Sequence, residues 1–216
     1  MKEKWKHTTV NLCWLFVLGS VAGFFMEGFW CMARTGVWER HAATVIGPFC
    51  VIYGVGAVAV YIVSNRIQKR NILVQWMVFA LCGAGIEYAA SLFQETVYGV
   101  ATWNYSRHIL NMGGRISLDM ALLFGSICLA FSRLLLPGLR RLFHRADGRF
   151  WRCAGILLTM LIVADLLLST VAITRWKNRA NEVVASNALE RMMDQVYDDD
   201  AMSSLFPNMR FVENQK

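Results

Sequence analysis

The chain has 216 residues, of which 56% are hydrophobic and only 17% charged, with a mean hydropathy of +0.39. This composition excludes disordered, collagen-like and disulfide-knot proteins and indicates a membrane protein. The formal net charge is +7, but the basic residues stand in short clusters at the ends of apolar runs, so they indicate membrane topology and not nucleic-acid binding.

Apolar stretches of about 20 residues, the length that crosses a hydrocarbon core of ~30 Å, recur along the chain. They predict five membrane-spanning helices, near residues 10–33, 46–64, 72–93, 115–136 and 153–174. The expected fold class is therefore all-α, a polytopic helical membrane protein with a C-terminal amphipathic helix. Three lysines before the first run resemble the start of a secretory signal, but that run is long enough to remain as a span.

The basic residues also predict the orientation of the chain in the membrane. With the N-terminus inside, the two inner loops hold Arg66, Lys69, Arg70 and six further arginines from Arg133 to Arg152. The two outer loops hold only Arg34, Arg40, Arg107 and Arg115. We therefore expect a multi-pass cell-membrane protein in contact with the lipid bilayer, with its N-terminus inside, its C-terminus outside and no nucleic-acid partner.

The last part of the chain has a different character, so we expect a transmembrane domain over residues 1–176 and a tail over 177–216. In the tail, apolar residues recur at helical spacing, at Leu189, Met192, Met193, Val196 and Tyr197. This pattern predicts an amphipathic helix, and Pro207 ends the segment. Such a helix either lies on the bilayer surface or on its own domain, or it acts as a lid or as a docking site for a partner.

Six cysteines lie within or at the ends of the apolar segments, at positions 13, 31, 50, 82, 128 and 153. They form no C-x-x-C pair and no recognisable ligand spacing with a histidine, so we expect neither structural zinc nor a disulfide framework, and no metal site or cofactor. No G-x-x-x-x-G-K-[ST] run is present, so this chain alone is not expected to hydrolyse ATP.

Carboxylates inside the predicted spans are the main functional signal, because an ionisable group in the bilayer is costly and marks a functional site by default. The predicted topology puts Glu27, Glu87, Glu95 and Asp119 in the outer half of the membrane and Asp165 near its middle.

The carboxylates of the third span also share one face. Glu87, Ser91, Glu95 and Gly99 follow each other at intervals of four, on one stripe if the helix continues that far. The stripe needs a cation or a proton, and Arg115 and Arg107 lie on the same side. Two bland alternatives stay open: Arg115 and Asp119 form a pair within one helix, or the network only holds the helices in register.

The loop before Arg115 is rich in aromatic and hydrogen-bonding residues, including Trp103, Tyr105 and Asn111. The aromatic pair suits an interfacial belt, and Gly113 and Gly114 permit a tight return into the membrane. In the second span, Gly54 indicates close helix packing.

Several blocks in order resemble one known family. They are Gly23-x-x-x-Glu27; Gly47-Pro48 with Tyr53-Gly54; Glu87-x-x-x-Ser91-x-x-x-Glu95-x-x-x-Gly99-x-x-x-Trp103-x-Tyr105-Ser106; Asn111-x-x-Gly114-Arg115-Ile116-x-Leu118; and Phe206-Pro207-Asn208-Met209. Together they resemble the bacterial integral membrane proteins of ABC-transporter type IV, the CmpB-like permeases. The resemblance implies a transporter permease-like component and, as partners, a separate ATPase or another membrane subunit.

The leading hypothesis is therefore a permease-like component with a polar site in the outer half of the bilayer, and not an enzyme. Its candidate substrate-binding residues are Glu27, Tyr53, Glu87, Ser91, Glu95, Trp103, Tyr105, Asn111, Arg115 and Asp119. With five spans and no internal repeat, it would work as a homo-oligomer or with partners. The alternatives are a membrane enzyme that acts on a lipid-linked envelope substrate, with Glu87 or Glu95 as base and Arg115 on a phosphate, and a non-catalytic regulatory subunit.

Overall fold

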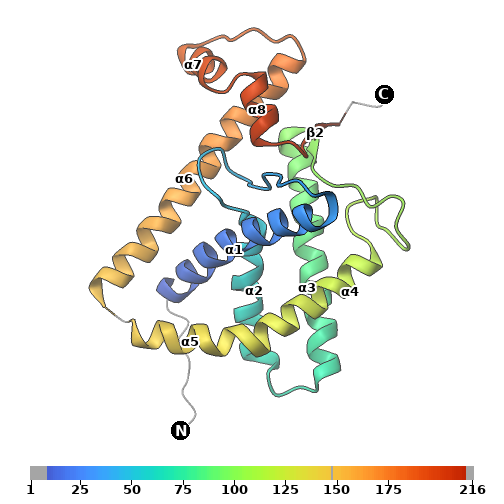
Figure 1. Cartoon of the computed structure of the whole chain (residues 1–216), viewed down its shortest axis with the longest axis vertical. Coiled ribbons are helices and arrows are strands. Elements are labelled where there is room, and N and C mark those ends of the chain that lie inside the picture. Colours follow the sequence, from blue (N-terminus) through green and yellow to red (C-terminus); the bar gives the residue numbers. More distant parts are fainter. Residues whose placement is uncertain (1–8, 147, 213–216) are drawn as a thin grey trace.

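Helices make up most of the computed structural model, which describes residues 9–146 and 148–212 (Figure 1). The long helices are α1 (Thr9–Thr35), α2 (Val51–Ile67), α3 (Ile72–Phe93), α4 (Leu118–Ala130), α5 (Leu136–Arg145) and α6 (Arg149–Ala180). A π-helical turn, η1 (Gln94–Tyr98), extends α3, and a second, η2 (Phe131–Leu135), joins α4 to α5. The tail forms α7 (Ala188–Val196) and α8 (Asp199–Leu205), and the strands β1 (Val100–Ala101) and β2 (Arg210–Phe211) pair antiparallel.

The all-α membrane class is confirmed, but the predicted number of long spans is wrong. Within the described residues, four stretches are long and apolar enough to cross a membrane, at Thr9–Thr35, Ile72–Tyr98, Leu118–Arg145 and Arg149–Ala180. The predicted span over 46–64 forms only the 17-residue α2, which is about 25 Å long at 1.5 Å per residue. Residues 46–50, the start of the predicted span, are not helical. The backbone amides of Ile46 and Gly47 donate to the Asp165 carboxylate, both at 3.2 Å, and so do not form helical hydrogen bonds.

Small residues allow α1 to pack closely on α2. A Cβ at Gly19 would lie 2.8 Å from the carbonyl oxygen of Tyr53, and one at Gly54 would lie 2.5 Å from that of Phe16. Both distances are shorter than ordinary van der Waals contact, so neither position has room for a side chain. The close packing predicted for Gly54 is present.

Two apolar clusters lie at opposite ends of the bundle. One consists of Leu15, Tyr61, Leu136 and Phe143, and beside it Trp14 of α1 stacks on Trp151 of α6 at 3.9 Å. We call this the basic end, because the α2–α3 loop and α5 carry their arginines there. The other cluster, at the tail end, is formed by Val45, Tyr98, Val100, Ala172, Ile173, Met202 and Phe206.

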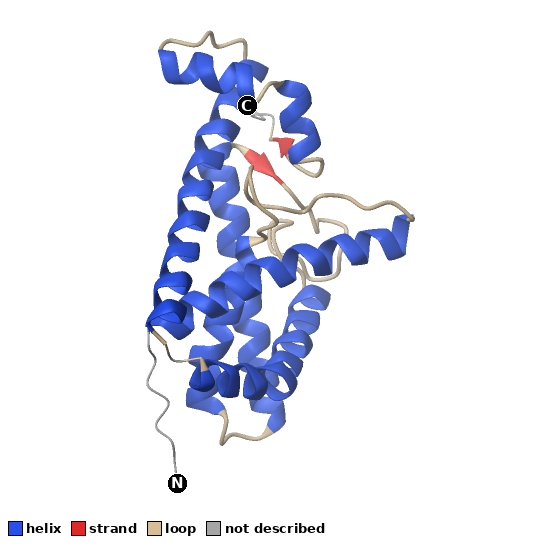
Figure 2. Ribbon diagram, turned by 60° about the vertical axis from the view of Figure 1, so that its left-hand side comes forward, coloured by secondary structure: helices blue, strands red, loops and turns tan. Residues whose placement is uncertain are grey.

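The tail packs on the chain's own helices at the tail end (Figures 1 and 2). The predicted amphipathic helix is present as α7, and a second helix follows because the Asp198 side chain caps α8 by accepting from the Ala201 amide at 2.8 Å. Arg175 of α6 donates two hydrogen bonds to Asp194 of α7, at 2.9 and 2.8 Å, and Arg179 adds a third at 2.6 Å. The structure thus supports the reading in which the tail helix lies on its own domain.

Candidate functional site

Glu27 of α1 and Tyr53 of α2 form the first element of the candidate site. The Tyr53 hydroxyl donates a short hydrogen bond to the Glu27 carboxylate. Gly23 makes this contact possible, because it lies one turn before Glu27 and the Tyr53 ring packs directly on its backbone. The sequence blocks that held these residues are therefore joined in space.

Glu87 of α3 forms the second element. Its side chain is buried, with 6% of the residue exposed, and its Oε1 accepts a hydrogen bond of 2.8 Å from the Tyr105 hydroxyl. Its Oε2 is also buried and has no hydrogen-bond partner in the described part of the chain. Burial, and then the adjacent Glu87 carboxylate, raise the pKa of Tyr105, so this phenol remains a donor. Tyr105, one of the candidate site residues, thus directs its hydroxyl toward Glu87.

The Glu27 and Glu87 carboxylates are close enough for their charges to interact. Glu27 and Glu87 interact with each other, and Glu27 also interacts with Tyr105. Both are held by neutral phenols, and among residues 9–146 and 148–212 neither has an ion-pair partner. Two nearby carboxylates of this kind require a proton or a bound cation.

Glu95 differs from Glu87 in the residue that it contacts. It forms an ion pair with Arg115, whose carbonyl accepts a hydrogen bond of 3.1 Å from the Trp103 indole. The predicted single stripe over Glu87, Ser91 and Glu95 is altered here because η1 is a wider, π-helical turn, of a kind often found at functional sites. Ser91 is buried one turn beyond Glu87.

The remaining candidates organise the loop before α4. The Asn111 amide donates to the carbonyls of Ser106 and His108, both at 3.1 Å, and its oxygen accepts from the Gly114 amide at 3.1 Å. His108 lies 2.7 Å from Asp119, which is exposed. Arg115 and Asp119 therefore have separate partners, and the alternative of a pair within one helix is wrong.

Asp165, which the sequence placed near mid-membrane, holds the loop between α1 and α2. Besides the two amides of that loop, its own carbonyl accepts from Ser169, whose hydroxyl accepts from the Val45 amide at 2.8 Å. Arg40 stabilises the same loop by donating to the carbonyls of Thr44, Val45 and Gly47. Burial lowers the pKa of Arg40, and the Asp165 charge opposes this effect.

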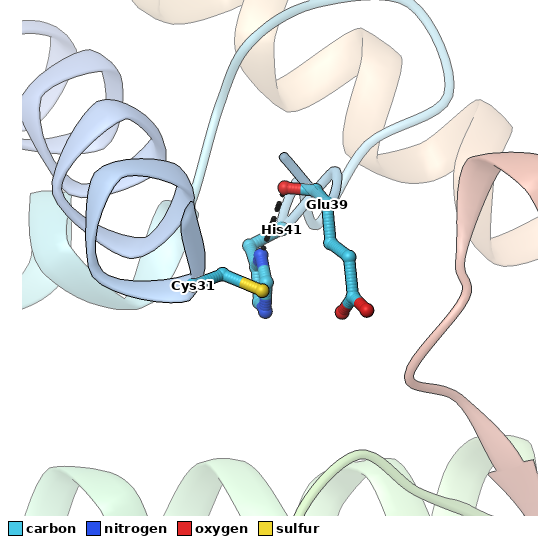
Figure 3. Close-up of side chains that lie close together, drawn as sticks. All are labelled: Cys31, Glu39 and His41. Atoms are coloured by element: carbon cyan, nitrogen blue, oxygen red, sulfur yellow. Dashed lines mark hydrogen bonds between the residues drawn. The ribbon is translucent and has the colours of Figure 1, made fainter. Parts of the chain in front are cut away.

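Sequence reasoning missed one cluster, which lies at the end of α1 and in the loop after it. Cys31 near the end of α1, and Glu39 and His41 in the loop, place their ligand atoms within 4.8 Å of one another (Figure 3). Their spacing, C-x₇-E-x-H, matches none of the usual zinc patterns. The available signal was the position of all three around a single helix end.

The long apolar helices define a polytopic membrane protein, and Glu87 and Asp165 are buried among its helices. The family model "Putative ABC-transporter type IV" matches residues 14–170. The chain belongs to this family, as its motifs indicated. No curated protein and no solved structure matches the chain.

Proposed function

We propose that this chain is a membrane transport component in which Glu27 and Glu87, with their tyrosine partners, bind a proton or a small cation. The observation that carries the proposal is the state of Glu87: a buried carboxylate with one oxygen on Tyr105, the other without a partner in the described chain, and a second carboxylate nearby. In a low-dielectric interior such a pair is stable only when its charge is compensated.

The other charged candidates are assigned a positioning role in this proposal. Arg115 is ion-paired with Glu95, so its charge is already compensated within the chain. This disfavours the alternative of an enzyme that holds a phosphate on Arg115. The loop of Trp103, Asn111 and Arg115 instead carries Tyr105 to the Glu87 carboxylate.

The proposal includes an orientation and partners. In Figure 1, α1 starts near the basic end and α6 finishes at the tail end. With the arginines of the basic end inside, the carboxylate pair lies in the outer half of the membrane and the C-terminus lies outside. Because the chain contains no P-loop motif, energy from ATP would come from a separate ATPase or another membrane subunit, and a homo-oligomer is an alternative assembly.

The test is ligand-dependent thermal stability of the full-length protein in detergent, over a series of pH values and with Na⁺, K⁺ and organic ammonium ions. A ligand that binds only the native state stabilises it by about 2.7 kcal/mol at 100 times its dissociation constant. We expect a proton- or cation-dependent stabilisation that Glu87→Gln abolishes.

Glu95→Gln is the matched control, since it removes a carboxylate from the same helix that has an arginine partner. It should lower the basal stability and leave the ligand response intact. If Glu87→Gln keeps the full response, or if no ion or pH change stabilises the parent protein, the carboxylate pair is not a binding site. Ion uptake into liposomes by the parent protein and by Glu87→Gln then measures transport itself.

A further inference from the structure

The end of α1 and the loop that follows it carry three potential metal ligands that the proposed transport site does not use. Cys31 offers a sulfur, Glu39 a carboxylate and His41 an imidazole, and all three side chains are partly buried. Figure 3 shows them directed toward one region at the end of α1. They are brought together because the chain reverses direction after Thr35.

The histidine is prepared to act through Nε2. His41 Nδ1 lies 3.0 Å from the carbonyl oxygen of Glu39, an arrangement that requires the proton on Nδ1. The lone pair of the neutral ring is then on Nε2. Metal-binding histidines typically donate their other N–H to a carbonyl or carboxylate in this way, which fixes the tautomer and the ring orientation.

The other two ligands are free to adjust. In the described part of the chain, no hydrogen bond or ion pair holds the Glu39 carboxylate, and the Cys31 sulfur has only a 3.6 Å contact with Thr35. Ligand atoms around a tetrahedral Zn²⁺ lie about 3.3–3.8 Å apart. The ligand atoms here all lie within 4.8 Å of one another, so binding requires an approach of about 1 Å, to which rotation of the Glu39 side chain can contribute.

A fourth ligand is available from the tail. The side-chain amide nitrogen of Asn208 lies 2.9 Å from His41 Nε2 and donates to its lone pair. Rotation of this carboxamide by half a turn puts its oxygen in the same place, which changes Asn208 from a competing donor into an oxygen ligand.

We propose that Cys31, Glu39 and His41 form a site for Zn²⁺ or a similar transition-metal ion where the α1–α2 loop meets the tail, with Asn208 or water completing the coordination. A thiolate and an imidazole favour Zn²⁺ over Mg²⁺ and Ca²⁺, which prefer oxygen ligands. None of these residues belongs to the proposed transport site, so this proposal does not depend on the transport function.

The test uses Co²⁺ as a spectroscopic probe, with the full-length protein purified in detergent and stripped of metal by a chelator. One Co²⁺ per chain should bind with a thiolate-to-cobalt charge-transfer absorption, and Zn²⁺, but not Mg²⁺ or Ca²⁺, should displace it. Cys31→Ser should remove that absorption. His41→Ala should weaken binding at least about 100-fold, since loss of even an indirect supporting residue weakens metal binding 10–100-fold.

Cys153→Ser is the matched control, because Cys153 is an exposed cysteine at the start of α6. It should leave the absorption unchanged, as should Glu87→Gln. Glu39→Gln provides a variant that is expected to fold normally, because no hydrogen bond or ion pair in the described part of the chain holds the Glu39 carboxylate, and to bind the metal more weakly than the parent. Absence of the charge-transfer absorption from the parent, or its persistence in Cys31→Ser, would overturn the proposal.

Discussion

Gly23→Ala should break the Glu27–Tyr53 hydrogen bond without touching either partner. A Cβ at this position would lie 2.5 Å from both Cβ and Cδ2 of Tyr53, which is about 1 Å inside ordinary contact. The phenol ring stands directly on the helix backbone, so it must move, and its hydroxyl leaves Glu27 as it does so.

The magnitude follows from two contributions. Overpacking of a well-packed interface costs about 1–3 kcal/mol, and loss of a hydrogen bond to a charged group costs about 1.5–3 kcal/mol. The higher helix propensity of alanine offsets about 0.5–1 kcal/mol of this. We therefore expect a destabilisation of about 2–5 kcal/mol.

The assay is reversible unfolding in mixed detergent micelles, followed by tryptophan fluorescence. Gly56→Ala is the matched control, since a Cβ there meets nothing within 4 Å, and it should be neutral or slightly stabilising. Tyr53→Phe removes the hydroxyl alone and should add little in the Gly23→Ala background, because the hydrogen bond is already lost. Full additivity of the two changes, or a neutral Gly23→Ala, would refute the reasoning.

Three other changes test the remaining contacts. Tyr105→Phe should destabilise the protein by about 1.5–3 kcal/mol in the same unfolding assay, because it leaves both oxygens of the buried Glu87 without a donor; a change below about 0.5 kcal/mol would contradict this contact. Arg175→Ala should weaken the docking of the tail by about 2 kcal/mol, seen as faster proteolysis of the segment after α6, whereas equal cleavage rates would contradict it. Hydrogen bonds from Arg175 lower the pKa of Asp194. The Asp194 carboxylate therefore contributes its full stabilisation of the docked tail at pH values above ~3.9, the ordinary pKa of aspartate. This stabilisation is lost as the pH falls through the lowered pKa of Asp194 in the folded protein. Hydrogen exchange in α7, corrected for intrinsic rates, should therefore rise only below about pH 4 in the parent protein.

The membrane class could be predicted because it depends on local composition. Runs of apolar residues identified four long helices, and the heptad-like spacing in the tail identified α7. The exception was the start of the second span, where an apolar sequence forms irregular structure. Its amides bind Asp165, which lies 119 residues away from Ile46 in the chain, and no local pattern contains that information.

The sequence indicated which carboxylates lie in apolar segments, but not which residues they contact. Burial of carboxylates in apolar segments singled out Glu27, Glu87 and Glu95, because their presence there is unfavourable unless they are compensated. Which residue compensates each of them depends on how the helices cross and on the π-helical turn that rotates Glu95 toward Arg115. Tyr53 and Tyr105 were among the candidate residues, but their direct hydrogen bonds to the two carboxylates were not predicted.

The short pairing of β1 with β2 holds the C-terminal part of the chain beside the loop that follows η1, so both lie on the same side of the membrane. Arg210 and Phe211 pair with the residues that follow α3, and the Val212 amide donates to the Gly99 carbonyl at 2.9 Å. Any segment joined to the C-terminus therefore emerges beside the loop that carries Tyr105. A fluorescent or affinity tag fused there would report the compartment of that loop, and because of its size it would also hinder access to the loop, so a tag at the opposite terminus is preferable for binding and uptake measurements.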